Sequence, residues 1–151
     1  MKYLIGVGTY TAGDDAIGLR IVEVIAEAGL DREFRAIDLS SNSLNLVAYL
    51  TPEAEAILIV DSAKMGLAPG EVRFFSPADV ETRKPSARIS THEGDVLRVL
   101  QLARAMGYPM PRLGIMGIEP ETIEERIGLS ATLEARTPGY VKAAIDELMR
   151  L

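Results

Sequence analysis

The sequence predicts an α/β protein of the three-layer α/β/α type, with a mostly parallel, twisted central sheet between two layers of helices. Apolar runs typical of strands alternate with helical patterns along the whole chain. The runs at 56–60 and 113–118 are almost continuously apolar, which is typical of strands covered on both faces. With 151 residues, 48% hydrophobic and 25% charged, the chain has the size and composition of one globular domain, residues 1–151.

Composition excludes several classes of function. The formal net charge of −6 argues against a nucleic-acid partner or an anionic membrane partner, because both select a cationic surface. No apolar run reaches 18 residues, so we expect neither a signal peptide nor a membrane span, and a cytoplasmic protein is predicted. The chain has no cysteine, which excludes a cysteine nucleophile, and only one histidine, His92, which must carry any imidazole chemistry.

The first eighteen residues read as a strand, a glycine-bearing loop and the start of a helix, and ligands bind at such junctions in open α/β sheets. Gly6 and Gly8 suggest a dinucleotide-binding fingerprint, but Thr11 stands where its third glycine belongs. Asp14 and Asp15 also occupy the positive end of the helix, where a pyrophosphate would bind. Either both aspartates cap this helix, or one of them has another task.

The remaining elements follow from periodicity, glycines and prolines. A serine at position 43 is predicted to cap the short second helix, Ser130 to cap the last one, and Pro138 to kink the last helix or mark a restart. Residues 76–88 are expected to form a surface connection. The predicted helices cover 17–28, 44–50, a stretch that begins within a residue or two of His92, and the tail after residue 130; the further strands cover 34–39, 56–61, 71–75 and 113–118.

Three side chains are predicted at the same edge of the sheet: Asp15 after the first strand, Asp61 at the end of a buried strand, and His92 in the loop before the third helix. Because neighbouring strands lie about 4.8 Å apart, such groups can converge on one ion. Two carboxylates and an imidazole suit a divalent transition metal that keeps open positions for a substrate. Alternatively, Asp61 only ends its strand, His92 is structural, and Asp38 is more consistent with a loop residue than with a ligand.

Five segments of the chain resemble, in order and spacing, the hydrogenase maturation endopeptidases, a family with a phosphorylase/hydrolase-like fold. These segments are Gly6–Gly8, Gly13–Gly18, Leu58–Ala63, Ser90–His92 and Leu113–Ile115. The loop Met65–Glu71 is most similar to the branch that serves hydrogenases of the formate-hydrogenlyase type.

The resemblance implies a protease that removes a C-terminal extension from the large-subunit precursor of a nickel–iron hydrogenase after nickel insertion. The residues matching the family's metal ligands are Asp15, Asp61 and His92, and the nickel is expected to come with the substrate, although other divalent metals can substitute. Either the metal activates the scissile carbonyl or a water, or Asp15 and Asp61 handle the water as an acid–base pair. This chain departs from the family at Thr9, where asparagine is usual, and at Leu39–Ser40, where two glycines are usual.

Three other functions remain open at this point. One is a metal-dependent hydrolase of a small substrate, and another is a non-catalytic nickel-binding maturation module. A nucleotide-binding domain is the third, which Thr11 and the paired aspartates disfavour. The sequence specifies neither the cleavage site nor the oligomeric state.

Overall fold

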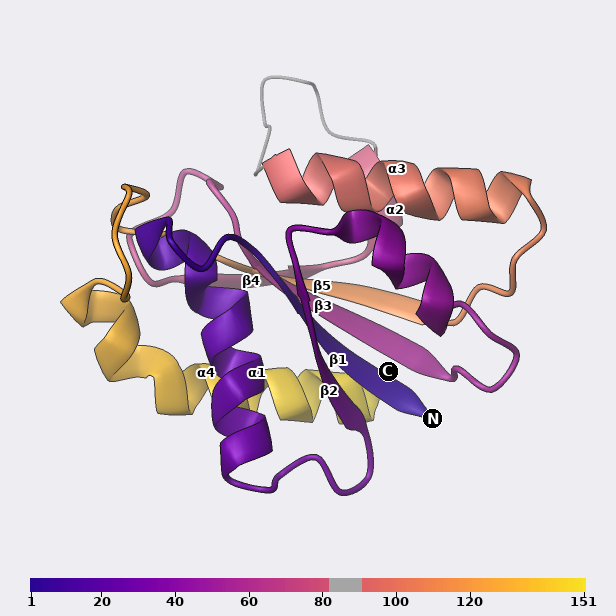
Figure 1. Cartoon of the computed structure of the whole chain (residues 1–151), viewed down its shortest axis with the longest axis horizontal. Coiled ribbons are helices and arrows are strands. Elements are labelled where there is room, and N and C mark those ends of the chain that lie inside the picture. Colours follow the sequence, from indigo (N-terminus) through magenta and orange to yellow (C-terminus); the bar gives the residue numbers. More distant parts are fainter. Residues whose placement is uncertain (82–90) are drawn as a thin grey trace.

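A five-stranded sheet forms the middle layer of the molecule (Figure 1). The computed structural model describes residues 1–81 and 91–151, and the side chains of 1–79 and 95–151. The strand order is β2-β1-β3-β5-β4, in which β4 alone is antiparallel to its neighbour. The strands are β1 (Lys2–Val7), β2 (Arg35–Ser40), β3 (Ala56–Ser62), β4 (Val72–Phe75) and β5 (Arg112–Ile118). The predicted mostly parallel sheet is therefore confirmed.

Helices cover both faces of the sheet, as the three-layer prediction requires (Figure 1). On one face, α1 (Ile17–Glu27) and α4 (Ala131–Arg150) pack on Leu4, Leu58 and Val60. On the other face, the 3-10 helix η2 (Ser43–Tyr49) and α3 (Thr91–Ala105) pack on Ile5, Ile57 and Ile59. All seven residues of β3 are buried, since this strand lies in the middle of the sheet with both faces covered. The elements η1 (Gly13–Ala16) and α2 (Pro77–Glu81) are short.

Glycines at the first strand bring α1 against the sheet. A Cβ atom added to Gly6 would lie 2.3 Å from the Gly18 carbonyl oxygen, and one added to Gly18 would lie 2.3 Å from the Val60 oxygen. Gly8 has φ +150° and leaves room for the Asp15 carbonyl, which a Cβ would approach to 2.1 Å. The glycines that suggested a dinucleotide fingerprint thus have a packing role, because no larger residue fits between helix and strand.

Several local predictions are wrong in detail. Residues 43–49 form a 3-10 helix in which Ser43 is the first helical residue, and Asn42 before it makes no capping side-chain bond. The first helix begins with η1, whose N-cap is Ala12, so Asp14 and Asp15 lie inside the first turn and are not its N-cap. Ser130 caps α4 as predicted, since its Oγ accepts from the Leu133 N–H at 3.4 Å.

The predicted alternatives for Pro138 are a kink in the last helix or a restart. Pro138 lies inside one continuous helix, α4, so it does not mark a restart. The predicted surface connection at 76–88 contains α2, and its residues 82–88 lie outside the described part of the chain. Among the described residues, no helix combines the length and the apolar composition needed to cross a membrane.

Leu39 and Ser40, which stand where the resembling family usually has two glycines, are the last two residues of β2. The register with β1 shifts here, because Gly6 pairs with Asp38 while Val7 pairs with Ser40. Leu39 is buried in the core under α3, and Ser40 adopts the left-handed region with φ +52°. Ser40 therefore keeps a backbone conformation that glycine adopts more readily.

Candidate functional site

Four buried carboxylates lie at or beside the carboxyl edge of the parallel strands. Asp14 and Asp15 follow β1, Asp61 lies near the end of β3, and Glu119 directly follows β5; each is at most 7% exposed. They are the only buried acidic side chains among the described residues. Burying carboxylates is costly unless donors or cations compensate them. The partners of each carboxylate therefore indicate its role.

Asp15 is held against the end of β3. The Ser62 hydroxyl donates to Oδ1 of Asp15 at 2.6 Å, and the backbone N–H of Thr9 donates to Oδ2 at 3.0 Å. Ser62 is 1% exposed and Asp15 is 5% exposed, so water competes little for this contact. These two donors, which bind different oxygens, fix the orientation of the carboxylate. The structure thus places Asp15 against the end of the strand that carries Asp61.

Asp61 and Ser62 leave β3 on opposite sides, because successive side chains of a strand alternate. Ser62 shares the side of Leu58 and Val60, which face α1 and α4, and there it meets Asp15. Asp61 shares the side of Ile57 and Ile59, which face η2 and α3. Asp61 is 3% exposed. At the end of β3, Ser62 therefore faces the helix layer where Asp15 lies, and Asp61 faces the layer that contains α3.

The third helix starts within two residues of His92, as predicted, but it starts before it: His92 is the second residue of α3 and does not lie in the preceding loop. The apolar residues of α3 that pack on the sheet, such as Val96 and Leu100, begin about one turn after His92. The side chain of His92 lies outside the described residues. Among the side chains that are described, no three acidic or imidazole groups are close enough to hold a metal ion. The three-ligand set of Asp15, Asp61 and His92 remains a prediction.

The neighbouring Asp14 has a structural role. It is completely buried, and it accepts three backbone N–H bonds from the segment after β5. The Glu121 and Thr122 amides donate to Oδ2 at 2.9 and 3.1 Å, and the Ser130 amide donates to Oδ1 at 2.7 Å. Of the two adjacent aspartates, Asp14 anchors a loop and Asp15 faces β3, which answers the question that the sequence left open.

Glu119 binds the loop after β3, which lies at the same edge of the sheet. Its Oε1 accepts from the backbone N–H groups of Met65 and Leu67 at 2.7 and 2.9 Å. The exposed carboxylate of Asp38 accepts from the amide and the hydroxyl of Ser40, both at 2.8 Å, so its contacts are local. Both carboxylates bind backbone at the edge of the sheet. Asp38 lies in strand β2, so the prediction that it is a loop residue is wrong.

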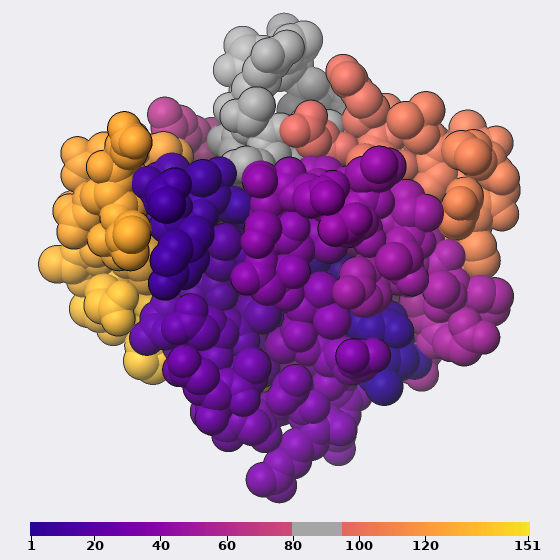
Figure 2. All heavy atoms as spheres, viewed as in Figure 1, coloured from indigo at the N-terminus to yellow at the C-terminus, as the bar shows by residue number. Residues whose placement is uncertain are grey.

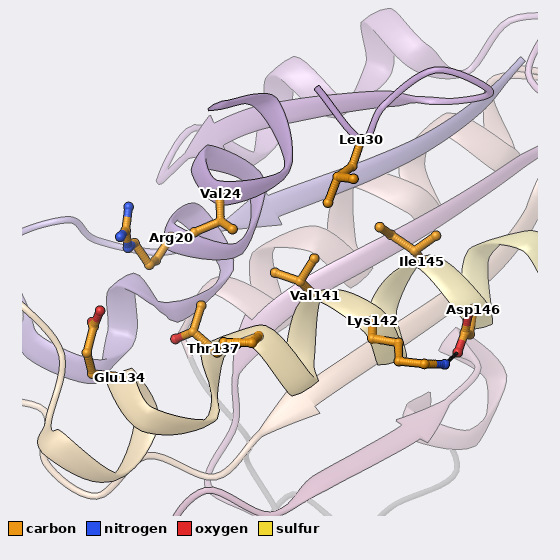
Figure 3. A pocket seen from close by; sticks show the side chains of 10 residues that line it. Arg20, Val24, Leu30, Glu134, Thr137, Val141, Lys142, Ile145 and Asp146 are labelled. Carbon is orange, nitrogen blue, oxygen red and sulfur yellow. Dashed lines mark hydrogen bonds and ion pairs between the residues drawn. The ribbon is translucent and has the colours of Figure 1, made fainter. Parts of the chain in front are cut away.

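A groove of about 560 Å³ lies elsewhere, between α1 and α4 (Figure 3). Its floor is apolar and includes Val24, Val141 and Ile145, while Lys142 and Asp146 form an ion pair of 2.7 Å at its rim. None of the candidate site residues lines this groove. The candidate site is therefore the carboxyl edge of the sheet.

Sequence reasoning missed the roles of Ser62 and Glu119. The sequence contained a signal for each residue. Ser62 follows Asp61 in the strand, so its side chain must point to the opposite face of the sheet. Glu119 follows a buried strand directly and so reaches the same edge as Asp61. The donor from Thr9 is a backbone amide, which no side-chain pattern reveals.

Comparisons with known proteins agree with this architecture. The family model described as HycI, hydrogenase maturation protease, matches residues 19–147. The chain is 29% identical over 148 residues to the hydrogenase expression/formation protein HupD of Rhodobacter capsulatus, covering 97% of this chain and 69% of HupD. It is 27% identical over 147 residues to the hydrogenase 2 maturation protease of Escherichia coli (strain K12), covering 97% of this chain and 87% of that protein.

A solved structure extends the agreement to the fold. The hydrogenase maturating endopeptidase HybD from E. coli superposes with a TM-score of 0.81 at 26% identity, covering 99% of this chain and 93% of HybD. The family model covers well over half of the chain. The chain therefore belongs to the hydrogenase maturation protease family and is an endopeptidase of hydrogenase maturation.

Proposed function

We propose that this endopeptidase removes the C-terminal extension of a nickel–iron hydrogenase large-subunit precursor, and that it recognises the nickel already present in that substrate. Family membership favours this function over a small-molecule hydrolase or a non-catalytic nickel module. The matching relatives and structures include proteins named HupD, HybD and HycI. Assignment to the formate-hydrogenlyase-type branch stays a prediction.

The observation that carries the proposal is the placement of Asp15 at the end of β3. Asp15 is buried and oriented by Ser62, the residue that follows Asp61. Two buried carboxylates on neighbouring parts of one sheet edge attract a cation. With the His92 imidazole they would supply an oxygen and nitrogen donor set that suits nickel or another divalent metal. A substrate that carries its own metal would thereby be aligned at this edge.

Hydrolysis of the scissile peptide needs three events: a water adds to the carbonyl carbon, the carbon–nitrogen bond breaks, and the leaving amine takes a proton. Asp15 and Asp61 can perform the proton transfers if one carboxylate accepts the water proton and returns it to the amine. The substrate's nickel can instead polarise the carbonyl. Both routes place the same two carboxylates at the reacting bond, and they differ in whether a carboxylate must accept a proton.

The test measures the intact mass of a cognate large-subunit precursor after incubation with the protein. Nickel-loaded and nickel-free precursors are compared in parallel. We expect loss of a C-terminal fragment from the loaded precursor alone. His92→Ala, Asp15→Asn and Asp61→Asn should each abolish this loss, whereas Asp38→Asn, an exposed carboxylate at the same edge, should leave it unchanged.

Two results would contradict the proposal. Equal cleavage of nickel-free precursor would remove nickel as the recognition element. Normal cleavage by His92→Ala would remove the imidazole from the donor set. Nickel binding by the isolated variants, measured by calorimetry, separates the two catalytic routes, because a variant that binds nickel normally but does not cleave has lost proton transfer.

A further inference from the structure

Apolar side chains are exposed on two loops beside the candidate site. Tyr10 is 55% exposed in the loop after β1, and Ile123 and Ile127 are 43% and 71% exposed in the segment after β5. We call residues 9–14 and 121–128 together the paired-loop surface. Figure 2 shows the two loops, in indigo and orange, side by side on one face of the molecule. Exposed apolar groups gathered next to a site are typical of docking surfaces.

Backbone hydrogen bonds hold the two loops together. The Arg126 amide donates to the Thr11 carbonyl at 2.9 Å, and the Gly13 amide donates to the Arg126 carbonyl at 3.0 Å. The Asp14 amide donates to the Thr122 carbonyl at 3.1 Å. The buried Asp14 carboxylate also accepts N–H bonds from Glu121 and Thr122 of the second loop and from Ser130 just beyond it. These bonds order the loops without burying Ile123 and Ile127. A preordered surface loses less conformational entropy when a partner binds.

The paired-loop surface is also acidic. Glu121, Glu124 and Glu125 are exposed on the second loop, and Arg126 is the one exposed basic side chain within residues 121–128. Arg126 lies 3.6 Å from Glu124, so this pair is electrically neutral and two carboxylates remain in excess. An acidic rim around isoleucine and tyrosine side chains selects a partner segment that combines apolar and basic residues.

Asp14 links the paired-loop surface to the carboxylate of Asp15. Asp14, which anchors the loop, is bonded covalently to Asp15, whose carboxylate lies at the end of β3. We propose that the paired-loop surface binds a basic, apolar segment of the large-subunit precursor close to its cleavage site. This inference rests on the proposed function, because it takes the precursor as the partner. It assigns to Ile123, Ile127 and the surrounding glutamates the role of substrate docking.

The first experiment replaces one exposed apolar side chain at the surface and one elsewhere. Ile127→Glu is compared with Leu102→Glu, since Leu102 is 57% exposed on α3. Leu102 lies ten residues beyond His92, which is about 15 Å along the helix. Binding of nickel-loaded precursor to each protein is measured by biolayer interferometry, and the initial cleavage rate is measured against precursor concentration. Circular dichroism verifies that both variants are folded.

We expect Ile127→Glu to weaken precursor binding and to raise KM by about tenfold or more, with kcat within about twofold of wild type. A factor of ten corresponds to about 1.4 kcal/mol, less than the value of one fully buried isoleucine. Leu102→Glu should change neither quantity. Unchanged binding by Ile127→Glu would overturn the inference, whether or not cleavage occurs. Conversely, weakened binding in a system where wild type cleaves no precursor would overturn the proposed function and retain the docking surface.

The second experiment tests the charge of the partner. Glu125→Lys is compared with Glu33→Lys, an exposed residue before β2, because both substitutions change the net charge equally. Glu125→Lys should weaken precursor binding at low salt and reduce its dependence on salt concentration. Glu33→Lys should reproduce the wild-type salt dependence. Equal effects of the two substitutions would show that only the overall charge matters, and that the precursor does not contact this rim.

Discussion

Replacing Ser62 by alanine tests whether the carboxylate of Asp15 depends on the end of β3. The substitution removes one oxygen atom and leaves the backbone bonds of the strand in place. In the wild-type protein the Ser62 hydroxyl donates to Asp15 at 2.6 Å, and both side chains are at most 5% exposed. After the substitution, Asp15 keeps the N–H bond from Thr9 on its other oxygen.

The expected loss of stability follows from this burial. Removing one donor from a buried hydrogen bond costs about 1–3 kcal/mol, and hydrogen bonds to charged groups fall in the upper part of that range. We therefore expect Ser62→Ala to lower the free energy of unfolding by about 2 kcal/mol. For a chain of this length, such a loss lowers Tm by about 4–8 °C.

A double-mutant cycle isolates this contact from other effects of the substitution. Ser62→Ala, Asp15→Ala and the double variant are unfolded in urea, and the coupling energy is calculated from the four free energies. We expect coupling of about 1–2 kcal/mol. The cleavage rate of nickel-loaded precursor should fall about tenfold or more in Ser62→Ala, because residues that orient metal ligands have effects of this size.

The control is Ser41→Ala, an exposed serine in the loop after β2, which should change stability by less than about 0.5 kcal/mol. Coupling near zero between Ser62 and Asp15 would refute the reasoning. A stability loss without any loss of cleavage would show that Ser62 supports the fold alone.

Three further predictions concern groups outside this pair. Asp14→Ala should lower the free energy of unfolding by about 3–5 kcal/mol, measured by urea denaturation, because one buried and two part-buried hydrogen bonds lose their acceptor; a loss below about 1 kcal/mol would contradict this role. Lys2→Met should cost about 1 kcal/mol and speed amide exchange in the last turn of α4, since Lys2 Nζ donates to the Leu148, Met149 and Leu151 carbonyls at 3.0–3.3 Å; unchanged exchange there would argue against a capping role. Burial raises the pKa of Tyr140, although Arg136 opposes the shift, so its contribution to stability is complete below about pH 10 and is lost as the pH rises through the folded-state pKa. The stability of wild type relative to Tyr140→Phe should therefore decrease above about pH 10 in denaturation measured across that range, and a constant difference would contradict the shift.

The sequence by itself determined the layers of this protein. The continuous apolar run of β3 specified a central strand, because only a strand covered on both faces can bury every side chain. The apolar stripe of α1, ended by Gly29 at φ +63°, specified a helix that packs by one side. The edge that carries Asp15 and Asp61 followed from the same alternation of strands and helices. Local periodicity suffices for these features because each depends on residues close together in the chain.

Only the tertiary structure separated the tasks of the two adjacent aspartates. Asp14 meets amides more than 100 residues away, and Asp15 meets Ser62 across the sheet. Likewise, Gly6 and Gly18 have a packing role because their backbones approach each other, which the motif alone could not distinguish from phosphate binding. The exposure of Ile123 and Ile127 also depends on the bonds from the first loop. These features are long-range contacts, and a side-chain pattern read along the chain does not specify which distant backbone groups it will meet.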